Sequence, residues 1–277
     1  MIDNEEIEII DNGAIEYLQF KRLLKAQDVF HIYIMKSHDM NFRIGKGFRL
    51  IEQVKKNLKL VCENSLMKYE TIIRPDYDHT NNVDCVNYVD NNKEIPELRG
   101  ERFICTDGLI TDKKDITLMS TNADCLLILL YDPVKKVIGN IHAGWRGSFG
   151  KISKNAIEKM VKEYDCNPKD IEAYFLPSIR KCHFEVDEDV KELCEKEFNY
   201  TGRINEIIEK GEIKDNKQKY LIDTCLINKI ILMESGLDEK NIIDSRICSV
   251  CNKDKIHSRR AEGENFGLGA AFIALYD

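Results

Sequence analysis

The chain has 277 residues, a length that suits one large domain or two modest ones with a sizeable core. Hydrophobic residues make up 43% of it and charged residues 32%, and no apolar run approaches the roughly 18 residues that a membrane-spanning helix needs. The formal net charge of −7 argues against nucleic acid or an anionic membrane as a partner, although a small anion can still bind locally.

The N-terminal stretch MIDNEEIEIIDNG is acidic rather than basic, so it does not read as a secretory signal and we expect a cytoplasmic protein. Residues 15–24 and 29–37 read as strands, and residues 47–65 space their apolar side chains as an amphipathic helix does. Residues 69–90 mix a short strand, a turn and a second strand. This part of the chain is therefore expected to contribute both strands and a helix.

Two apolar runs near the middle of the chain, 126–131 and 137–142, are joined by a short turn that contains Pro133 and predict an antiparallel hairpin. Three further segments are expected to be helices: 151–164, 184–198 and 223–236. The tail, 267–277, is expected to be a buried strand. Strands that pair locally and alternate irregularly with helices favour an α/β (α+β) fold. No repeat or linker divides the chain, so we expect a single domain over 1–277.

The predicted hairpin brings two soft-metal ligands together. Facing residues of the two strands have numbers that sum to about 268, so Cys125 lies opposite His142 or one place from it. Both side chains then point to the same face, at a separation that suits two ligands of one zinc ion. A buried cysteine and a hydrogen-bonded histidine fit the same spacing. The best third ligand is His79 in a polar turn, but spacing alone does not choose it over the histidines at 38, 183 and 257.

Glycine and arginine residues near the end of the hairpin indicate an anion site. Gly144, Gly147 and Gly150 precede a helix that is expected to begin near Ile152, and a helix N-terminus presents free N–H groups to an anion. Arg146 can add a bidentate contact. The stretch is not a phosphate-binding P-loop, because its glycine spacing is one residue too long and Ile152 stands where Ser or Thr would hold magnesium.

A polar loop, HSRRAEGENFGLG, places Arg259 and Arg260 close to His257, and it is either a solvated face or a second anion contact. The ten cysteines are expected to be reduced thiols. Most of them, including Cys62 and Cys194, occur in helix-like patterns typical of the core. The CSVC motif at 248–251 has no second pair at zinc-ribbon spacing, which favours a structural or buried pair.

The segment ADCLLILLYDPVKKVIGNIHAGWRG, residues 123–147, closely resembles the signature of the laccase-domain family, also called the multicopper polyphenol oxidase or purine nucleoside phosphorylase family. TDGLIT precedes it at the family's distance, and LPSIRKCHFEV, ICSVC and SRRAEG are similar to later family segments in the same order. The resemblance runs from roughly residue 30 to the C-terminus, and its ADC and HAGWRG pieces are highly specific.

The resemblance implies a zinc ion held by His79, Cys125 and His142, within central mixed, largely antiparallel sheets flanked by helices. It also implies phosphorolysis of purine nucleosides such as adenosine, inosine and methylthioadenosine, to free base and ribose 1-phosphate, with adenosine deamination also attributed to the family. The expected phosphate- and substrate-binding residues are Gly144, Arg146, Gly147, Arg259 and Arg260.

Two residues are expected to act in catalysis. Arg146 would hold the anionic substrate, and Asp124 would orient His142 or relay a proton. A hydrogen bond at the start of a strand explains Asp124 equally well.

The chain also departs from the family pattern. Lys36 stands near the place of an arginine in an early loop, and Leu268 replaces an arginine near the tail. Substrate range therefore stays open, and so do three alternatives: a copper-dependent polyphenol oxidase, a cysteine hydrolase with Cys125 as nucleophile and His142 as base, and a metal-binding paralogue of low activity. The sequence indicates neither a protein partner nor an oligomeric state.

Overall fold

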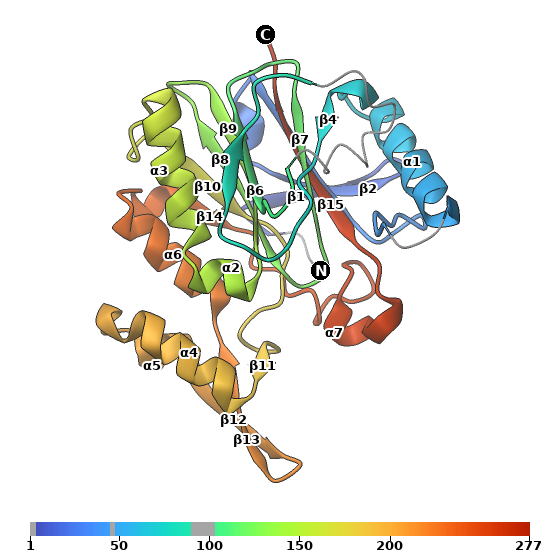
Figure 1. Ribbon diagram of the computed structural model, residues 1–277. Coiled ribbons are helices and arrows are strands. Elements are labelled where there is room, and N and C mark those ends of the chain that lie inside the picture. Colours follow the sequence, from blue (N-terminus) through green and yellow to red (C-terminus); the bar gives the residue numbers. More distant parts are fainter. Residues whose placement is uncertain (1–3, 45–47, 90–102) are drawn as a thin grey trace.

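The computed structural model describes residues 4–44, 48–89 and 103–277 and contains two six-stranded sheets (Figure 1). The first sheet has the strand order β1 (Ile7–Asp11), β2 (Glu16–Phe20), β3 (Val29–Ile34), β15 (Gly269–Leu275), β7 (Thr117–Asn122) and β4 (Ile72–Ile73). The second has the order β14 (Ile242–Asp244), β10 (Glu172–Phe175), β8 (Leu126–Asp132), β9 (Val137–Ala143), β6 (Gly108–Thr111) and β5 (Val83–Cys85).

A smaller sheet of three strands and a set of helices complete the described fold. The small sheet has the order β11 (Glu185–Val186), β13 (Lys217–Ile222) and β12 (Ile208–Lys214). The helices are α1 (Phe48–Glu63), α2 (Trp145–Phe149), α3 (Ile152–Tyr164), α4 (Glu188–Phe198), α5 (Ile204–Ile207), α6 (Thr224–Glu234) and α7 (Arg259–Glu262). None of the helices in the described ranges is both long and apolar enough to cross a membrane.

The strand directions confirm the predicted fold class. Strands β4 and β7, β5 and β6, and β10 and β14 pair in parallel, whereas the other neighbouring strands of the two large sheets pair antiparallel. The sheets are thus mixed and largely antiparallel. Helices cover their outer faces, as an α/β fold of this kind requires.

The two large sheets pack face to face around the main core, which explains the continuous apolar run of β8. Leu127, Leu129 and Tyr131 point between the sheets, where they meet residues of the first sheet such as Tyr33 and Ile273. The alternate side chains of β8 point to the opposite face and pack beneath α3. A strand that is buried on both faces reads as an unbroken apolar stretch rather than as an alternating one.

Helices close the outer faces, so that the body has four layers (Figure 1). Ile152, Ala156 and Met160 of α3 pack on the second sheet, as their spacing predicts. Val54 and Leu58 of α1 pack on the first sheet. Helix α4 and the β12–β13 hairpin project from this body at the bottom of Figure 1.

A polar contact joins the two sheets inside the core. Asn140 on β9 is buried, and its Nδ2 donates to the carbonyl oxygens of Leu118 on β7 and Ala271 on β15, each at 3.1 Å. The Ser120 hydroxyl of β7 donates to Asn140 Oδ1. All hydrogen-bonding groups of the Asn140 amide face the other sheet, which satisfies the buried group.

The predicted hairpin is confirmed, with one correction at its open end. Leu126 pairs with Ala143 and Leu127 with His142, so facing numbers sum to 269 rather than 268, and Cys125 lies just before the strand. The glycine-rich end also differs from expectation, because the short helix α2 forms there before α3. Gly47 and Asp90, at the ends of two predicted segments, lie outside the described residues.

Candidate metal centre and substrate pocket

The structure brings His79, Cys125 and His142 together at the open end of the β8–β9 hairpin. One ligand atom from each lies within 4.8 Å of the others, and Cys125 Sγ is 4.0 Å from His79 Nε2. His142 is buried on β9, whereas His79 is exposed in the loop between β4 and β5. The cluster therefore opens to solvent on one side.

The other candidate histidines lie elsewhere. His38 contacts the Asp11 carboxylate, and His257 contacts Glu262 and the carbonyl of Met40. His183 belongs to a separate group of cysteines. The three-residue cluster is therefore the one that the family resemblance implied.

Asp107 contacts the ring of His142 and the backbone of His79. It is fully buried, and its Oδ1 lies 2.9 Å from His142 Nδ1. The same carboxylate accepts hydrogen bonds from the backbone N–H groups of His79, at 3.1 Å, and Thr80, at 2.8 Å. A carboxylate that accepts a hydrogen bond from the Nδ1–H of a histidine leaves Nε2 free to bind a metal. Sequence reasoning missed this role, although Asp107 lies within the TDGLIT segment.

The charges of these groups favour cation binding. Burial opposes ionisation of the Cys125 thiol, but His142 and His79 outweigh it and lower the pKa of Cys125. Burial likewise opposes protonation of His142, but Cys125 and Asp107 raise the pKa of the imidazole. The thiolate is the form of cysteine that binds metal ions. A cation bound by Cys125 and His142 would compensate the negative charge of the thiolate.

Gly144 has a packing role in this cluster. A Cβ atom added at this position would come within 2.9 Å of His79 Cδ2 and 3.3 Å of Cys125 Sγ. A Cβ on Gly147 would come within 2.7 Å of the Thr80 carbonyl oxygen, so this glycine lets α2 approach the loop that carries His79. The two glycines thus bring the ligand segments together, and the anion-binding role expected of them stays a prediction.

Gly144→Ala is expected to weaken metal binding while leaving the protein folded. The added methyl group has no room between His79 and Cys125, so one ligand must shift. A change in ligand placement of this kind costs about 10–100-fold in metal affinity. Competition with a chromophoric chelator measures the affinity, and circular dichroism reports the fold. An unchanged affinity would mean that the ligand loop adapts freely.

The Asp124 carboxylate accepts hydrogen bonds from residues other than His142, and the role expected of it, orienting His142 or relaying a proton, stays a prediction. Its backbone has a left-handed φ of 84°, and its Oδ1 accepts hydrogen bonds from the hydroxyls of Ser249 and Ser258. Its Oδ2 accepts from the backbone N–H of Arg260 at 2.8 Å. The carboxylate that contacts the His142 ring is that of Asp107. Asp124 ties the start of β8 to two later loops, which matches the alternative of a hydrogen bond at a strand start.

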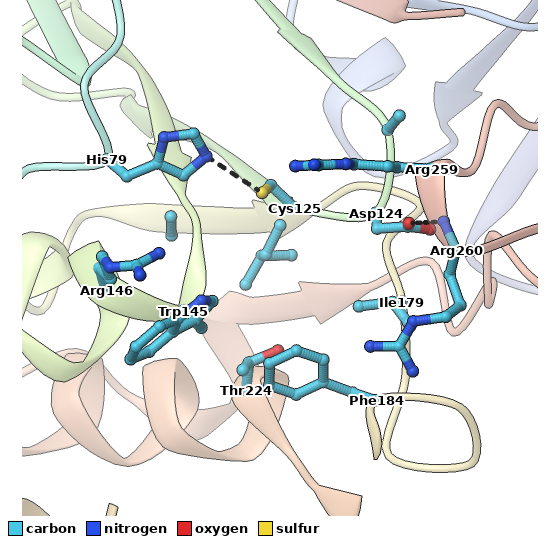
Figure 2. Close-up of a pocket in the computed structure, with 13 residues that line it drawn as sticks. His79, Asp124, Cys125, Trp145, Arg146, Ile179, Phe184, Thr224, Arg259 and Arg260 are labelled. Atoms are coloured by element: carbon cyan, nitrogen blue, oxygen red, sulfur yellow. Dashed lines mark hydrogen bonds between the residues drawn. The ribbon is translucent and has the colours of Figure 1, made fainter. Parts of the chain in front are cut away.

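A cavity of about 460 Å³ lies against the exposed side of the cluster (Figure 2). This volume is within the range of small-molecule sites. The cavity combines metal ligands, apolar side chains and arginines, and its lining residues are His79, Ala123, Asp124, Cys125, Leu126, Ala143, Trp145, Arg146, Ile179, Phe184, Thr224, Arg259 and Arg260. Lys36 and Leu268, the two departures from the family pattern, are not among them.

Two of the three arginines predicted to bind an anion contact aromatic rings but have no acidic partner in the described part of the chain. Arg146 lies over the Trp145 ring with its guanidinium carbon 4.2 Å from the centroid, and Arg259 lies 5.6 Å from the centroid of Phe266. Neither forms an ion pair with any residue of the described ranges. Both approach the cavity, from opposite sides in Figure 2. Arg260 differs, because its guanidinium donates to the backbone carbonyls of residues 183 and 185.

Comparison with known proteins identifies the family of the chain. A family model described as multi-copper polyphenol oxidoreductase laccase matches residues 39–276. Purine nucleoside phosphorylase YlmD of Bacillus subtilis (strain 168) is 28% identical over 225 residues, which cover 80% of this chain and 77% of that protein. Adenosine deaminase RL5 of an unknown prokaryotic organism is 33% identical over 171 residues, which cover 61% of this chain and 62% of that protein.

A solved structure shares the fold. The crystal structure of Bacillus licheniformis hypothetical protein YfiH aligns with a TM-score of 0.81 at 22% sequence identity, over 97% of this chain and 99% of that chain. Together with the family model, which spans most of the sequence, this likeness confirms the resemblance found in the ADC and HAGWRG segments. The chain belongs to the laccase-domain family.

Proposed function

We propose that the chain is a zinc-dependent purine nucleoside phosphorylase that acts on adenosine, inosine or methylthioadenosine. One observation carries the proposal: a single cavity joins a cluster of three metal ligands to two arginines whose guanidinium groups have no acidic partner among the described residues. A phosphorylase needs such a cavity because it must hold phosphate beside the sugar. The relatives that bear the name purine nucleoside phosphorylase support the same reaction.

The donor set fits a catalytic zinc ion. Cys125 supplies a sulfur whose pKa is lowered by its histidine neighbours, and His79 and His142 supply imidazole nitrogens. Zinc with three protein ligands keeps a fourth position open and acts as a Lewis acid towards water or substrate. Copper also accepts two histidines and a cysteine, so metal analysis of the purified protein decides between them.

The residues of the cavity then have distinct tasks. Arg146 and Arg259 hold phosphate, while Trp145 and Phe184 offer aromatic faces to the purine. A phosphate oxygen attacks C1′ of the ribose as the C1′–N9 bond breaks. The purine leaves with the bonding electron pair and takes up a proton, which the phosphate supplies in the overall balance. Arginines fixed beside the reacting phosphate stabilise the charge that develops between it and the sugar.

Adenosine deamination is the second candidate. In this reaction water adds at C6 of the purine and ammonia leaves, so phosphate is not consumed. The three-ligand cluster favours it, because three protein ligands leave a place for water on the metal. The relative named adenosine deaminase RL5 supports it independently of the cavity.

Chromatography of nucleoside reactions separates these candidates. Purified protein of known metal content is incubated with adenosine or inosine, with and without phosphate. Release of free base that depends on phosphate is expected, and conversion of adenosine to inosine without phosphate identifies deamination instead. If neither product forms although the metal is bound, the proposal fails and a metal-binding paralogue becomes the better description. Oxidation of a phenol that requires copper would favour a polyphenol oxidase.

Arg146→Ala is expected to raise the KM for phosphate by about 10-fold or more while leaving the metal content unchanged. The loss of a charged hydrogen-bonding partner costs about 1.5–3 kcal/mol, and each 1.4 kcal/mol is tenfold. Initial rates at varied phosphate and saturating nucleoside measure the effect. Arg246→Ala is the matched control, since it removes an exposed arginine that does not line this cavity. An unchanged phosphate KM in Arg146→Ala would remove this residue from the phosphate site.

A further inference from the structure

A second group of potential metal ligands lies outside the catalytic cluster. Cys182 and His183 follow strand β10, and Cys248 and Cys251 follow strand β14. One ligand atom from each of the four lies within 4.8 Å of the others. Because β10 and β14 are parallel neighbours, their C-terminal ends meet at one edge of the sheet and bring these two loops together.

The spacing of the four side chains matches a tetrahedron. Cys182 Sγ is 3.6 Å from Cys248 Sγ and 3.9 Å from Cys251 Sγ. His183 Nδ1 lies 3.1, 3.6 and 3.5 Å from the sulfurs of Cys182, Cys248 and Cys251, respectively. Tetrahedral zinc with ordinary bond lengths separates two sulfurs by ~3.8 Å and a sulfur from a nitrogen by ~3.5 Å. Four of the five separations lie within ~0.2 Å of those expected around one zinc ion, and the separation between Cys182 and His183 is ~0.4 Å shorter.

The chemistry of the group also favours a metal over a disulfide. The two sulfur–sulfur distances far exceed the roughly 2.05 Å of a disulfide bond, and all four ligand atoms lie within 4.8 Å of one another. We propose that Cys182, His183, Cys248 and Cys251 bind a second, structural zinc ion.

The loops that carry this second site also contribute to one wall of the substrate cavity. The four protein ligands of the second site leave no open position, which is the mark of a structural rather than a catalytic zinc site. The His183 carbonyl accepts a hydrogen bond from the guanidinium of Arg260, and Phe184 follows it directly in the cavity lining. Ser249, next to Cys248, donates to Asp124 at 2.6 Å. The zinc therefore fixes the two loops that position one side of the cavity.

Metal stoichiometry tests the proposal in the full-length protein. Wild-type protein is expected to bind two zinc ions per chain, and Cys251→Ser and Cys125→Ala are each expected to bind one. Cys62→Ser is the matched control, because it removes a half-buried thiol on α1 and should keep both ions. His183→Cys should also keep both, since four cysteines form an ordinary zinc site. Full zinc content in Cys251→Ser would overturn the proposal.

X-ray absorption of the wild-type protein gives a second readout that needs no variant. Two occupied sites predict an average of about two sulfur ligands per zinc, because one site supplies three and the other one. A single zinc with one sulfur would overturn the second site while leaving the proposed function intact. A single zinc with three sulfurs would support the second site and count against the catalytic metal.

Discussion

Cys125→Ala is expected to empty the metal site proposed at His79, Cys125 and His142 and to abolish the proposed nucleoside cleavage together. The substitution removes the only sulfur ligand of that cluster, and two histidines alone hold zinc poorly. We expect the rate to fall by at least ~10²-fold, the scale on which the loss of one electrostatic contact acts in other enzymes. Zinc analysis by mass spectrometry and chromatography of the free base measure the two effects on the same preparation.

The outcome also separates the metal proposal from a cysteine nucleophile. If Cys125 attacks substrate directly, a thiol reagent labels it in the protein as purified, and chelation changes nothing. If the thiolate binds zinc, labelling requires that the metal be removed first. A Cys125→Ala protein that keeps its full zinc content but has lost activity would contradict the metal role and favour the nucleophile.

Asp107→Asn is expected to weaken metal binding by about 10–100-fold, because it alters the group that orients His142. It should also destabilise the fold. The Oδ2 atom of Asp107 accepts from the backbone N–H and the hydroxyl of Thr80, and an amide NH₂ in its place would set donor against donor. Leaving such buried groups unsatisfied costs about 1–3 kcal/mol.

Chelator competition and urea unfolding measure these two effects of Asp107→Asn. Asp84→Asn is the matched control, because Asp84 is a partly exposed carboxylate on β5 that accepts from Thr106 and contacts none of the metal ligands. A normal zinc affinity in Asp107→Asn would show that the ring of His142 is held by packing alone, for example by Tyr77, whose ring centroid lies 4.7 Å away.

The hairpin and two of its metal ligands were within reach of sequence reasoning because they depend on local pairing. Strands β8 and β9 are joined by a short turn, so the numbers of facing residues follow from arithmetic. The observed register differs by one residue from the predicted sum, and it is the observed register that puts both ligands on one face: Leu127 faces His142, and Cys125 lies two residues before Leu127.

Asp107 escaped the same reasoning because its place depends on a distant strand. It precedes β6, and only the pairing of β6 with β9 brings it beside His142. One local signal was present. The next residue is Gly108, where a Cβ would come within 2.7 Å of Ile141 Cδ1, so the TDG motif marks a close approach between strands.

The grouping of the CSVC motif with Cys182 and His183 could not be predicted from the sequence for a similar reason. Its partners Cys182 and His183 lie more than sixty residues earlier, and the parallel pairing of β10 and β14 unites them. Parallel pairing joins segments across a long connection, which periodicity does not reveal. Helix α2 was missed for a different reason. It contains Gly147, a residue type that disfavours helices, and this glycine is needed where α2 approaches Thr80 in the loop of His79.

The buried Asn140 amide has a consequence for folding fidelity. If β9 slipped by one residue against its neighbours, His142 would point to the outer face and Asn140 would leave its acceptors on β7 and β15. Apolar side chains alone discriminate weakly between the two alignments of a strand that is buried on both faces. The unsatisfied Asn140 amide would destabilise the shifted alignment by a further ~1–3 kcal/mol. Asn140 and His142 lie on the same face of β9. The hydrogen bonds of Asn140 that disfavour a shifted alignment of β9 therefore also disfavour chains in which His142 points away from the other ligands.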